Sequence, residues 1–426
     1  KIYKRGEQDQ ELTDIIRTNV RFPSLAMGDF RAQIASIRTG ERRFTELLSK
    51  YGKGAVQGSI QRIYQHSERL ARANVATIPD GVYEAESYMD DDGVNIGKSI
   101  PIKVRVIVRG EEMTVDLSEV SVQVAGQYNS GVTAGRSAAE VAFKCLTSPL
   151  FLPINYGSFL PLKINLPLGR IVSATKPAAV RSWLTVPMTV VDTIFKAMAQ
   201  AVPDRSIGGH YADLCVSLIN GVDKRTGRFF IISAGHPGGG WGAKQTEDGR
   251  SATVAINDGD THNAPVESLE SKAPIIFERR SLREDSGGAG QHRGGLGVSM
   301  DMRVTTPAVL NVSIERTHCA PWGLDEASSG LANLVYIKRA DGTEVRPPNG
   351  KMRGIELADG DTYVVESGGG GGFGNPRERP VEAVLADVKA GYVSVEAARR
   401  DYGVVIDAVS LELDAPATQR LRSTGR

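Results

Sequence analysis

The stretch DSGGAGQHRGGLG, residues 285–297, holds six glycines in thirteen residues, and the use of these glycines decides how the rest of the chain packs around them. Three uses are considered: a phosphate cradle, a catalytic loop and a tight corner. A Walker-type phosphate loop requires a lysine followed by serine or threonine at the start of a helix. This stretch contains no lysine, and no helix is predicted to follow it. We therefore expect the glycines to let the backbone turn at positive φ or approach another segment closely. Asp285 and Arg293 are expected to form a charge-assisted pair across the base of the loop.

Glycine also clusters at residues 235–242 and 368–374. The string SGGGGGFG at 367–374 contains the GxGxxG pattern of dinucleotide-binding proteins, but a run of glycine matches this pattern trivially. It leads into Asn375-Pro376 rather than into a helix, so it lacks the structural context of a dinucleotide site. We expect the clusters to form glycine-rich corners between strands, and we predict no cofactor-binding residues in the chain.

Hydrophobic periodicity predicts an α+β fold with helical ends and a β-rich body. Apolar residues at helical spacing, such as Phe30, Ile34 and Ile37, indicate helices near the N-terminus, whereas Val104 and Val106 alternate with charged residues as in a strand. The four predicted parts are a helical segment at 1–78, a mixed α/β region at 79–211, a β-rich domain with glycine turns at 212–376, and a C-terminal helical appendage at 377–426.

The acidic run DDDG at residues 90–93 is predicted to be a solvated turn. A calcium-binding EF-hand loop would need ligands at alternate positions and a glutamate at its twelfth position, and threonine and valine positions follow instead. His66 lies among polar residues and is predicted to be an exposed histidine.

The composition argues against several classes of protein. Lysine and arginine number 51 and aspartate and glutamate number 50, which gives a net charge of +1. The chain therefore lacks the excess of positive charge that is typical of nucleic-acid-binding proteins. No stretch approaches the roughly 18 apolar residues of a membrane-spanning helix, so no membrane partner is expected. The three cysteines are scattered and form no CxxC pair. We therefore expect neither a disulfide framework nor a zinc site, and we predict a cytoplasmic protein.

Candidate functional residues cluster in the segment DGDTHNAPVESLE at residues 258–270. Its polar density suits hydrogen bonding to a small substrate, or support of a metal ion that other residues bind; a solvated loop is the alternative. The six histidines form no HxH or HxxxH pair, so the sequence offers no local metal chelate, and ligands that converge from distant loops stay open as an alternative. No catalytic residue is assigned. The candidate residues are Asp258, His262, Asn263 and Glu267, followed by Asp285, His292 and Arg293.

Several strings together resemble the B-type subunits of the hydantoinase/oxoprolinase family, which includes N-methylhydantoinase B, the C-terminal half of oxoprolinase, and subunits of acetone and acetophenone carboxylases. The strings run in order over nearly the whole chain, and the stretch at 285–297 and the last string are the most specific. The matching strings are NVRFPSLAMGDFRAQIASIRTGERR (19–43), PINYGSF (153–159), KPAAVRS (176–182), NAPVESLE (263–270), DSGGAGQHRGGLG (285–297), PWGL (321–324) and GGGGFGNPRERPVEAVLADVKAGYVSVEAARRDYGV (369–404).

This resemblance implies ATP-dependent chemistry shared between two subunits. An A-type partner binds ATP, and the B-type protein processes the activated small-molecule substrate at a divalent-metal site. In the hydantoinase and oxoprolinase relatives a cyclic amide is phosphorylated on oxygen and then opened by water. In the carboxylase relatives a ketone is activated as an enol phosphate and joined to carbon dioxide. Three functions are therefore open: a cyclic-amide hydrolase component, a carboxylase subunit, and a non-catalytic scaffold portion of such a complex.

The chain departs from the family at its start. The family's N-terminal part carries an Asn-Asp-Pro string and a Gly-Gly-Thr-His string that look like metal ligands, and neither occurs here. KIYKRGEQ at residues 1–8 resembles the point just after that part. The resemblance thus implies that this chain is the C-terminal portion of a B-type protein, and on that ground no metal ligand is assigned within it. Its expected partners are the metal-bearing N-terminal portion and the A-type subunit.

Overall fold

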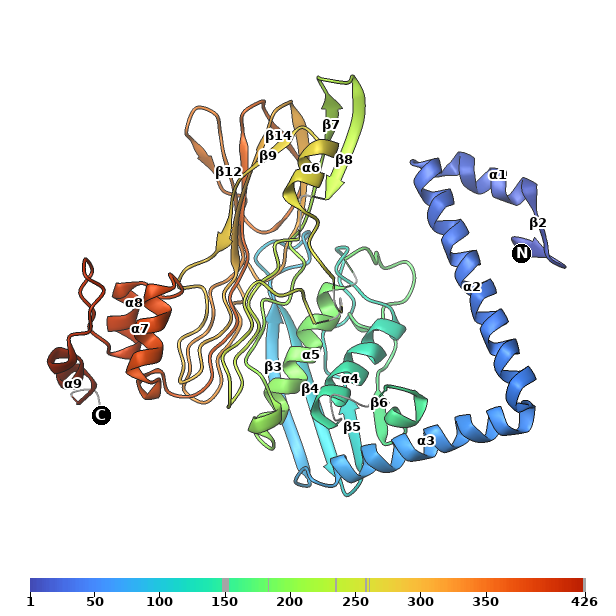
Figure 1. The fold of residues 1–426 in the computed structure, drawn as a ribbon, viewed down its shortest axis with the longest axis horizontal. Coiled ribbons are helices and arrows are strands. Elements are labelled where there is room, and N and C mark those ends of the chain that lie inside the picture. The colour runs from blue at the N-terminus through green and yellow to red at the C-terminus, as the bar shows by residue number, and fades with distance from the viewer. Residues whose placement is uncertain (148–152, 183, 234–235, 257–258, 260, 424–426) are drawn as a thin grey trace. The chain divides into compact units, whose positions relative to one another are not determined.

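The computed structural model describes residues 1–147, 153–182, 184–233, 236–256, 259 and 261–423. The chain divides into two compact units, residues 1–69 with 155–157, and residues 70–154 with 158–426. The fold is mixed α+β, as predicted, with helices toward both ends and mainly antiparallel sheets between them (Figure 1). No helix within the described ranges is long and apolar enough to cross a bilayer.

The N-terminal unit is mainly helical. Its elements are β1 (Tyr3–Lys4), β2 (Glu7–Gln8), α1 (Gln10–Asn19), α2 (Pro23–Tyr51) and most of α3 (Lys53–Val75). Gly52 separates α2 from α3 with a φ of 77°, which glycine adopts without steric cost. Along α2, Ile37, Phe44 and Tyr51 recur every seven residues and remain exposed. His66 on α3 is also largely accessible to solvent, as the polar residues around it predict.

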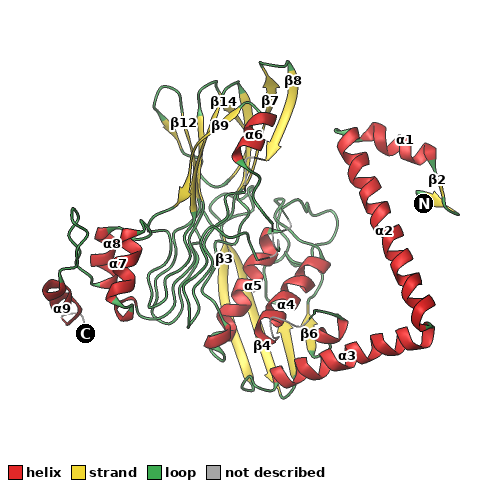
Figure 2. Ribbon diagram, in the orientation of Figure 1, coloured by secondary structure: helices red, strands yellow, loops and turns green. Residues whose placement is uncertain are grey.

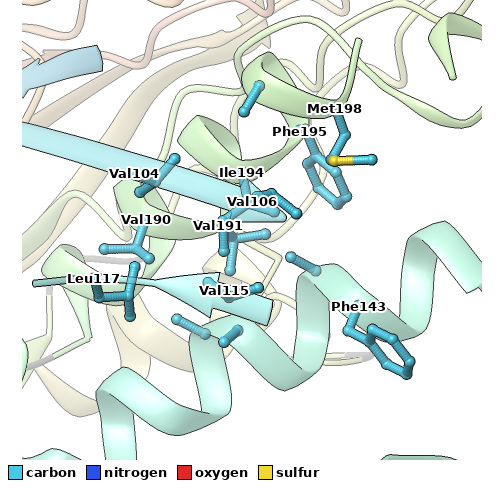
Figure 3. Close-up of a cluster of buried hydrophobic side chains, with 14 of the residues drawn as sticks. Val104, Val106, Val115, Leu117, Phe143, Val190, Val191, Ile194, Phe195 and Met198 are labelled. Carbon is cyan, nitrogen blue, oxygen red and sulfur yellow. The ribbon is translucent and has the colours of Figure 1, made fainter. Parts of the chain in front are cut away.

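The larger unit begins with a four-stranded sheet packed against two helices. Its elements are β3 (Gly81–Met89), β4 (Ile100–Arg109), β5 (Glu112–Asp116), α4 (Val132–Thr147), β6 (Leu162–Asn165) and α5 (Thr185–Met198). β3, β4 and β5 are antiparallel neighbours, and β6 lies parallel to β5. Figure 3 shows Val104 and Val106 of β4 in one cluster with Val190 and Ile194 of α5. Burying such a side chain stabilises the fold by about 1.5–3 kcal/mol, so the alternation predicted from sequence fixes this layer.

The β-rich part forms two antiparallel sheets that share a core. Its elements are β7 (Val216–Asp223), β8 (Arg228–Ser233), α6 (Val266–Lys272), β9 (Ile275–Leu282), β10 (Val298–Val304), β11 (Ala308–Ser313), β12 (Leu334–Lys338), β13 (Glu344–Val345), β14 (Lys351–Leu357) and β15 (Thr362–Glu366). The strand orders are β14-β11-β7-β8 and β13-β12-β15-β10-β9. One hydrophobic cluster takes Ile219 and Leu310 from the first sheet and Met300 and Val365 from the second. The two sheets therefore pack on each other.

Glycine-rich segments form a bundle of extended chains outside the named strands (Figure 2). In segment 367–374 the backbone N–H groups of residues 367, 370 and 373 donate to segment 292–298, while those of 369 and 372 donate to segment 328–331. The repeat of three, with hydrogen bonds only to neighbouring segments, is the pattern of a polyproline II helix. Glycine allows such helices to pack side by side, as it does at the crowded axis of collagen.

The six glycines of residues 285–297 serve this close packing. None of them has a positive φ; in this stretch only Asp285 does, at 58°. A Cβ on Gly294 would lie 1.9 Å from the Gly370 carbonyl oxygen, and one on Gly287 would lie 2.1 Å from the Gly294 carbonyl oxygen. The expectation of close approach is therefore confirmed, and the expectation of a turn at positive φ is wrong for these glycines. The clusters form packed, extended segments rather than corners between strands.

The C-terminal helices form the predicted appendage, and they bind the glycine-rich stretch. The helices are α7 (Val381–Lys389), α8 (Val395–Tyr402) and α9 (Ala415–Ser423), and short 3-10 helices lie at Tyr156–Phe159, Pro203–Arg205 and Pro376–Glu378. Arg293 Nε lies 3.5 Å from Asp387 Oδ2 on α7. Asp285 Oδ1 accepts a hydrogen bond of 2.8 Å from the Ser394 N–H. The predicted Asp285–Arg293 pair is wrong, because each side chain binds the appendage instead.

The DDDG run is buried, so the prediction of a solvated turn is also wrong. Asp90, Asp91 and Asp92 are each 3% exposed or less. Burial acts to raise the pKa of Asp90, but hydrogen bonds from the Cys319 N–H and from Thr317 outweigh it and lower the pKa below its usual value. These partners lie more than 200 residues away along the chain, so the run ties the first sheet to the β-rich part.

A second buried carboxyl, Asp213, makes stability depend on pH. Burial raises its pKa to about 7, the hydrogen bond of 2.8 Å from the Cys215 N–H opposes this rise, and the nearby Glu315 carboxylate adds to it. Between the ordinary value of 3.8 and about 7, the folded protein holds the Asp213 proton more tightly than the unfolded chain does. The contribution of Asp213 to stability is therefore greatest at low pH and is lost as the pH rises to about 7.

The variant Asp213→Asn cannot ionise, so it should gain stability over the wild type as the pH rises from about 4 to about 7, with a constant difference above that range. Urea unfolding at intervals from about pH 4 to about pH 8 measures the two free energies of unfolding. Asp204→Asn, at an exposed carboxylate, is the matched control. A difference between Asp213→Asn and wild type that stays the same at every pH would contradict the assignment.

Candidate functional site

A cavity of about 250 Å³ lies in the β-rich part, beside β8, β9 and the segment that leads into α6. Its volume is below the roughly 300 Å³ at which pockets for drug-sized ligands begin, so it suits a small ring. Tyr211, Val254 and Leu269 give it apolar walls. The polar residues that line it are Ser233, His236, Thr261, His262, Asn263 and Arg280.

His236 follows β8 and is oriented by one hydrogen bond. Its Nδ1 lies 2.9 Å from the Leu214 carbonyl oxygen, which can only accept, so the proton resides on Nδ1. In the neutral imidazole, Nε2 then carries the lone pair and can accept a proton or a hydrogen bond from a ligand. Among the cavity residues, His236 is therefore suited to act as a proton acceptor.

Arg280 brings an uncompensated positive charge to the cavity. Its neighbour on β9, Arg279, pairs with Asp301 at 2.8 Å, whereas Arg280 has no ion pair within the described part of the chain. Partial burial lowers the pKa of Arg280, but a guanidinium stays protonated at any physiological pH. Arg280 thus offers a binding partner for an anion, or for negative charge that develops during a reaction.

The cavity gathers part of the candidate set that the sequence analysis proposed. His262 and Asn263 line it. Glu267 lies in the first turn of α6, is exposed, and is not one of the lining residues. Asp258 lies outside the described residues.

The three candidates from the glycine-rich stretch lie elsewhere. Asp285 and Arg293 bind the C-terminal appendage, and His292 Nδ1 lies 3.8 Å from Asp248 Oδ1. Arg293 is only 4% exposed, and its Nη1 donates to the Gly294 carbonyl oxygen at 2.7 Å. Their observed contacts serve packing of the glycine bundle.

Four polar lining residues were missing from the predicted set: Ser233, His236, Thr261 and Arg280. The sequence signal for each is weak. His236 occurs in the turn-rich string AGHPGGGWG, but His210 and His262 also lie in turn-rich strings, so the sequence gave His236 no priority over them. Arg280 is one of several charged residues in a strand, where alternation alone does not distinguish a cavity residue from a solvated one.

The residues present do not fit a divalent-metal centre. Over the ranges that the structure describes, no group of three or more His, Cys, Asp or Glu side chains is arranged to hold a metal ion. Of these four residue types, the described lining of the cavity contains His236 and His262 alone. A catalytic metal usually takes three protein ligands, so no step proposed below passes through a metal.

Comparison with known proteins places this chain in a family. Residues 1–376 match the family model for hydantoinase B/oxoprolinase. The chain belongs to the hydantoinase B/oxoprolinase family. A family member from Pseudomonas sp. (strain NS671), named for the B component of a D-/L-hydantoinase, is 31% identical over 434 residues, which cover 99% of this chain and 72% of the relative. The beta chain of the caprolactamase of Pseudomonas jessenii is 30% identical over 437 residues, which cover 99% of this chain and 73% of the relative.

Two solved structures share the fold of this chain. The crystal structure of the ATP-dependent caprolactamase from Pseudomonas jessenii superposes with a TM-score of 0.87 at 28% identity, covering 99% of this chain and 73% of that one. The nucleotide-free structure of an acetone carboxylase superposes with a TM-score of 0.88 at 18% identity, covering 100% and 63%. At that identity the second likeness concerns the fold alone.

Proposed function

We propose that this chain forms all or part of the B-type component of an ATP-dependent cyclic-amide hydrolase. It would open a phosphorylated hydantoin- or oxoproline-like ring together with an ATP-binding A-type subunit. The observation that carries the proposal is the identity of 30–31% along 99% of the chain to proteins named for hydantoinase and caprolactamase. Hydantoin and caprolactam are both cyclic amides, so the shared chemistry is cleavage of a ring C–N bond.

The cavity supports this proposal because its lining matches a small phosphorylated ring. Val254 and Leu269 would pack against ring carbons, while the Asn263 amide supplies a donor and an acceptor for polar ring atoms. Arg280 would bind the phosphate, since a guanidinium forms two parallel hydrogen bonds to such a group. The site thus combines shape, hydrogen bonding and charge of the required kinds.

His236 would accept a proton during ring opening. Phosphorylation of the amide oxygen makes the ring carbon electrophilic, and water then adds to that carbon. The proton that the water loses passes to His236 Nε2, and the ring nitrogen takes up a proton as the C–N bond breaks, which leaves an acyl phosphate. A second water then hydrolyses the acyl phosphate to the carboxylate and inorganic phosphate. ATP belongs to the A-type subunit in this proposal, and the divalent metal of the family to residues outside this chain.

The complex of this chain with its natural partners is expected to release phosphate from ATP when given a hydantoin, 5-oxoproline or caprolactam, with turnover on the order of 1 s⁻¹ or faster. Phosphate release and ring-opened product are measured together, with a complex that lacks this chain as the control. Turnover with a ketone and bicarbonate, and none with a cyclic amide, would show a carboxylase component instead. Unchanged turnover in Arg280→Gln and His236→Gln complexes would show a scaffold.

A further inference from the structure

A second cavity, of about 110 Å³, lies in the larger unit beside β11, β14 and the first turn of α5. It is far larger than the roughly 15 Å³ that one water molecule needs, yet well below the size of a drug-binding pocket. Arg181 and Arg353 line it from two separate segments, together with Ser182 and Ser313. The cavity therefore has room for a small polar group and offers it two positive charges.

The two arginines have no counter-charge from this chain. Neither guanidinium forms an ion pair with a carboxylate of any residue that the structure describes, although most arginines of this unit do form such pairs. The described lining of the cavity contains no aspartate or glutamate. Both arginines are exposed, so an anion can reach them from solvent, and an anion in the cavity would lie among lining residues that include two positive charges and no negative one.

The hydroxyl groups of the cavity are held in place by buried partners. Ser313 Oγ lies 2.6 Å from the Tyr128 hydroxyl and 3.1 Å from Ser182 Oγ. Tyr128 is 1% exposed, so this end of the network is fixed by the core. The side chains of Leu184, Leu214 and Leu218 form an apolar wall beside these hydroxyls. A fixed polar edge against an apolar wall is the arrangement of a built binding site.

We propose that this cavity binds a small oxyanion, a phosphate or a short carboxylate, at a site separate from the candidate substrate cavity. Arg181 and Arg353 would each bind anion oxygens through charge-assisted hydrogen bonds. One hydroxyl of the Ser182–Ser313 pair would donate to the anion, since the hydrogen bond between the two serines uses the proton of the other. The two cavities share one segment of the chain. Leu214 lines the anion cavity, and its carbonyl oxygen holds His236 of the substrate cavity.

Isothermal titration of the full chain with sodium phosphate, sodium acetate and sodium chloride, at constant ionic strength, tests the site. We expect saturable binding of phosphate or acetate, weakened at least about 10-fold in Arg181→Gln and in Arg353→Gln. Arg399→Gln, at an exposed arginine on α8, should bind as the wild type does. Phosphate binding without acetate binding would identify a tetrahedral ligand, and the converse a carboxylate.

Thermal melting of each variant verifies that it is folded, so weakened binding cannot be attributed to unfolding. The proposal is wrong if neither oxyanion binds saturably. It is also wrong if binding is equal in the double variant Arg181→Gln/Arg353→Gln, or if chloride binds as tightly as the oxyanions. None of these measurements depends on enzymatic activity, so they test the anion site independently of the proposed function.

Discussion

Replacing Gly370 by alanine is expected to prevent the larger unit from folding. A Cβ at this position would lie 1.9 Å from the Trp241 carbonyl oxygen and 2.6 Å from the Gly242 backbone nitrogen. Both obstacles are backbone atoms in hydrogen-bonded segments, so they cannot move aside as a flexible side chain would. Overpacking of this kind costs about 3 kcal/mol or more, which is a large part of the stability of an ordinary domain.

The matched control is Gly131→Ala, in the same unit, where a Cβ would meet nothing within 4 Å. Soluble yield and thermal melting by circular dichroism compare both variants with the wild type. We expect Gly370→Ala to be insoluble or to melt many degrees lower, and Gly131→Ala to behave as the wild type. A Gly370→Ala protein that melts with the control would show that the bundle tolerates a wider spacing than the structure has.

The sequence predicts those parts of the fold that depend on local periodicity. Alternation along β4 and the apolar spacing of Phe30, Ile34 and Ile37 on α2 are properties of short windows, and both elements lie where their patterns predict them. The glycine bundle has no such signal. Glycine carries no side chain to reveal a period, and the partners of segment 367–374 lie up to about 160 residues away in the chain. Only the structure shows that its glycines are required for contact between backbones.

The candidate site divides in the same way. His262 and Asn263 entered the predicted set because polar density along one loop is visible in sequence, and both line the cavity. His236 and Arg280 reach the same cavity because β8 and β9 lead to it, and strand order cannot be read from the residues. For Asp90 the sequence predicted exposure to solvent, and the structure shows burial. An acidic run is usually solvated, but here distant N–H groups satisfy its carboxylate.

Replacing His236 by glutamine is expected to lower kcat of the complex by about 100-fold or more with little change in KM. Glutamine can still donate a hydrogen bond to the Leu214 carbonyl oxygen, so the local packing is preserved, but its amide cannot take up a proton. The loss should therefore fall on the step in which water is deprotonated. Steady-state kinetics with a cyclic amide and ATP measures kcat and KM separately.

Two further measurements separate a proton acceptor from a residue that only supports the cavity. Added imidazole should restore part of the activity of His236→Ala, because the free base can enter the space that the ring has left and accept the proton. The control is His66→Ala, which removes an exposed histidine of α3 that is far from the cavity residues in sequence. This variant should be as active as the wild type, and imidazole should not change its activity. A His236→Gln enzyme with unchanged kcat, or a His236→Ala enzyme that imidazole does not rescue although it is folded, would remove His236 from the proposed chemistry. Arg280 would then keep its proposed role in the reaction, because phosphate binding requires its charge and not a base.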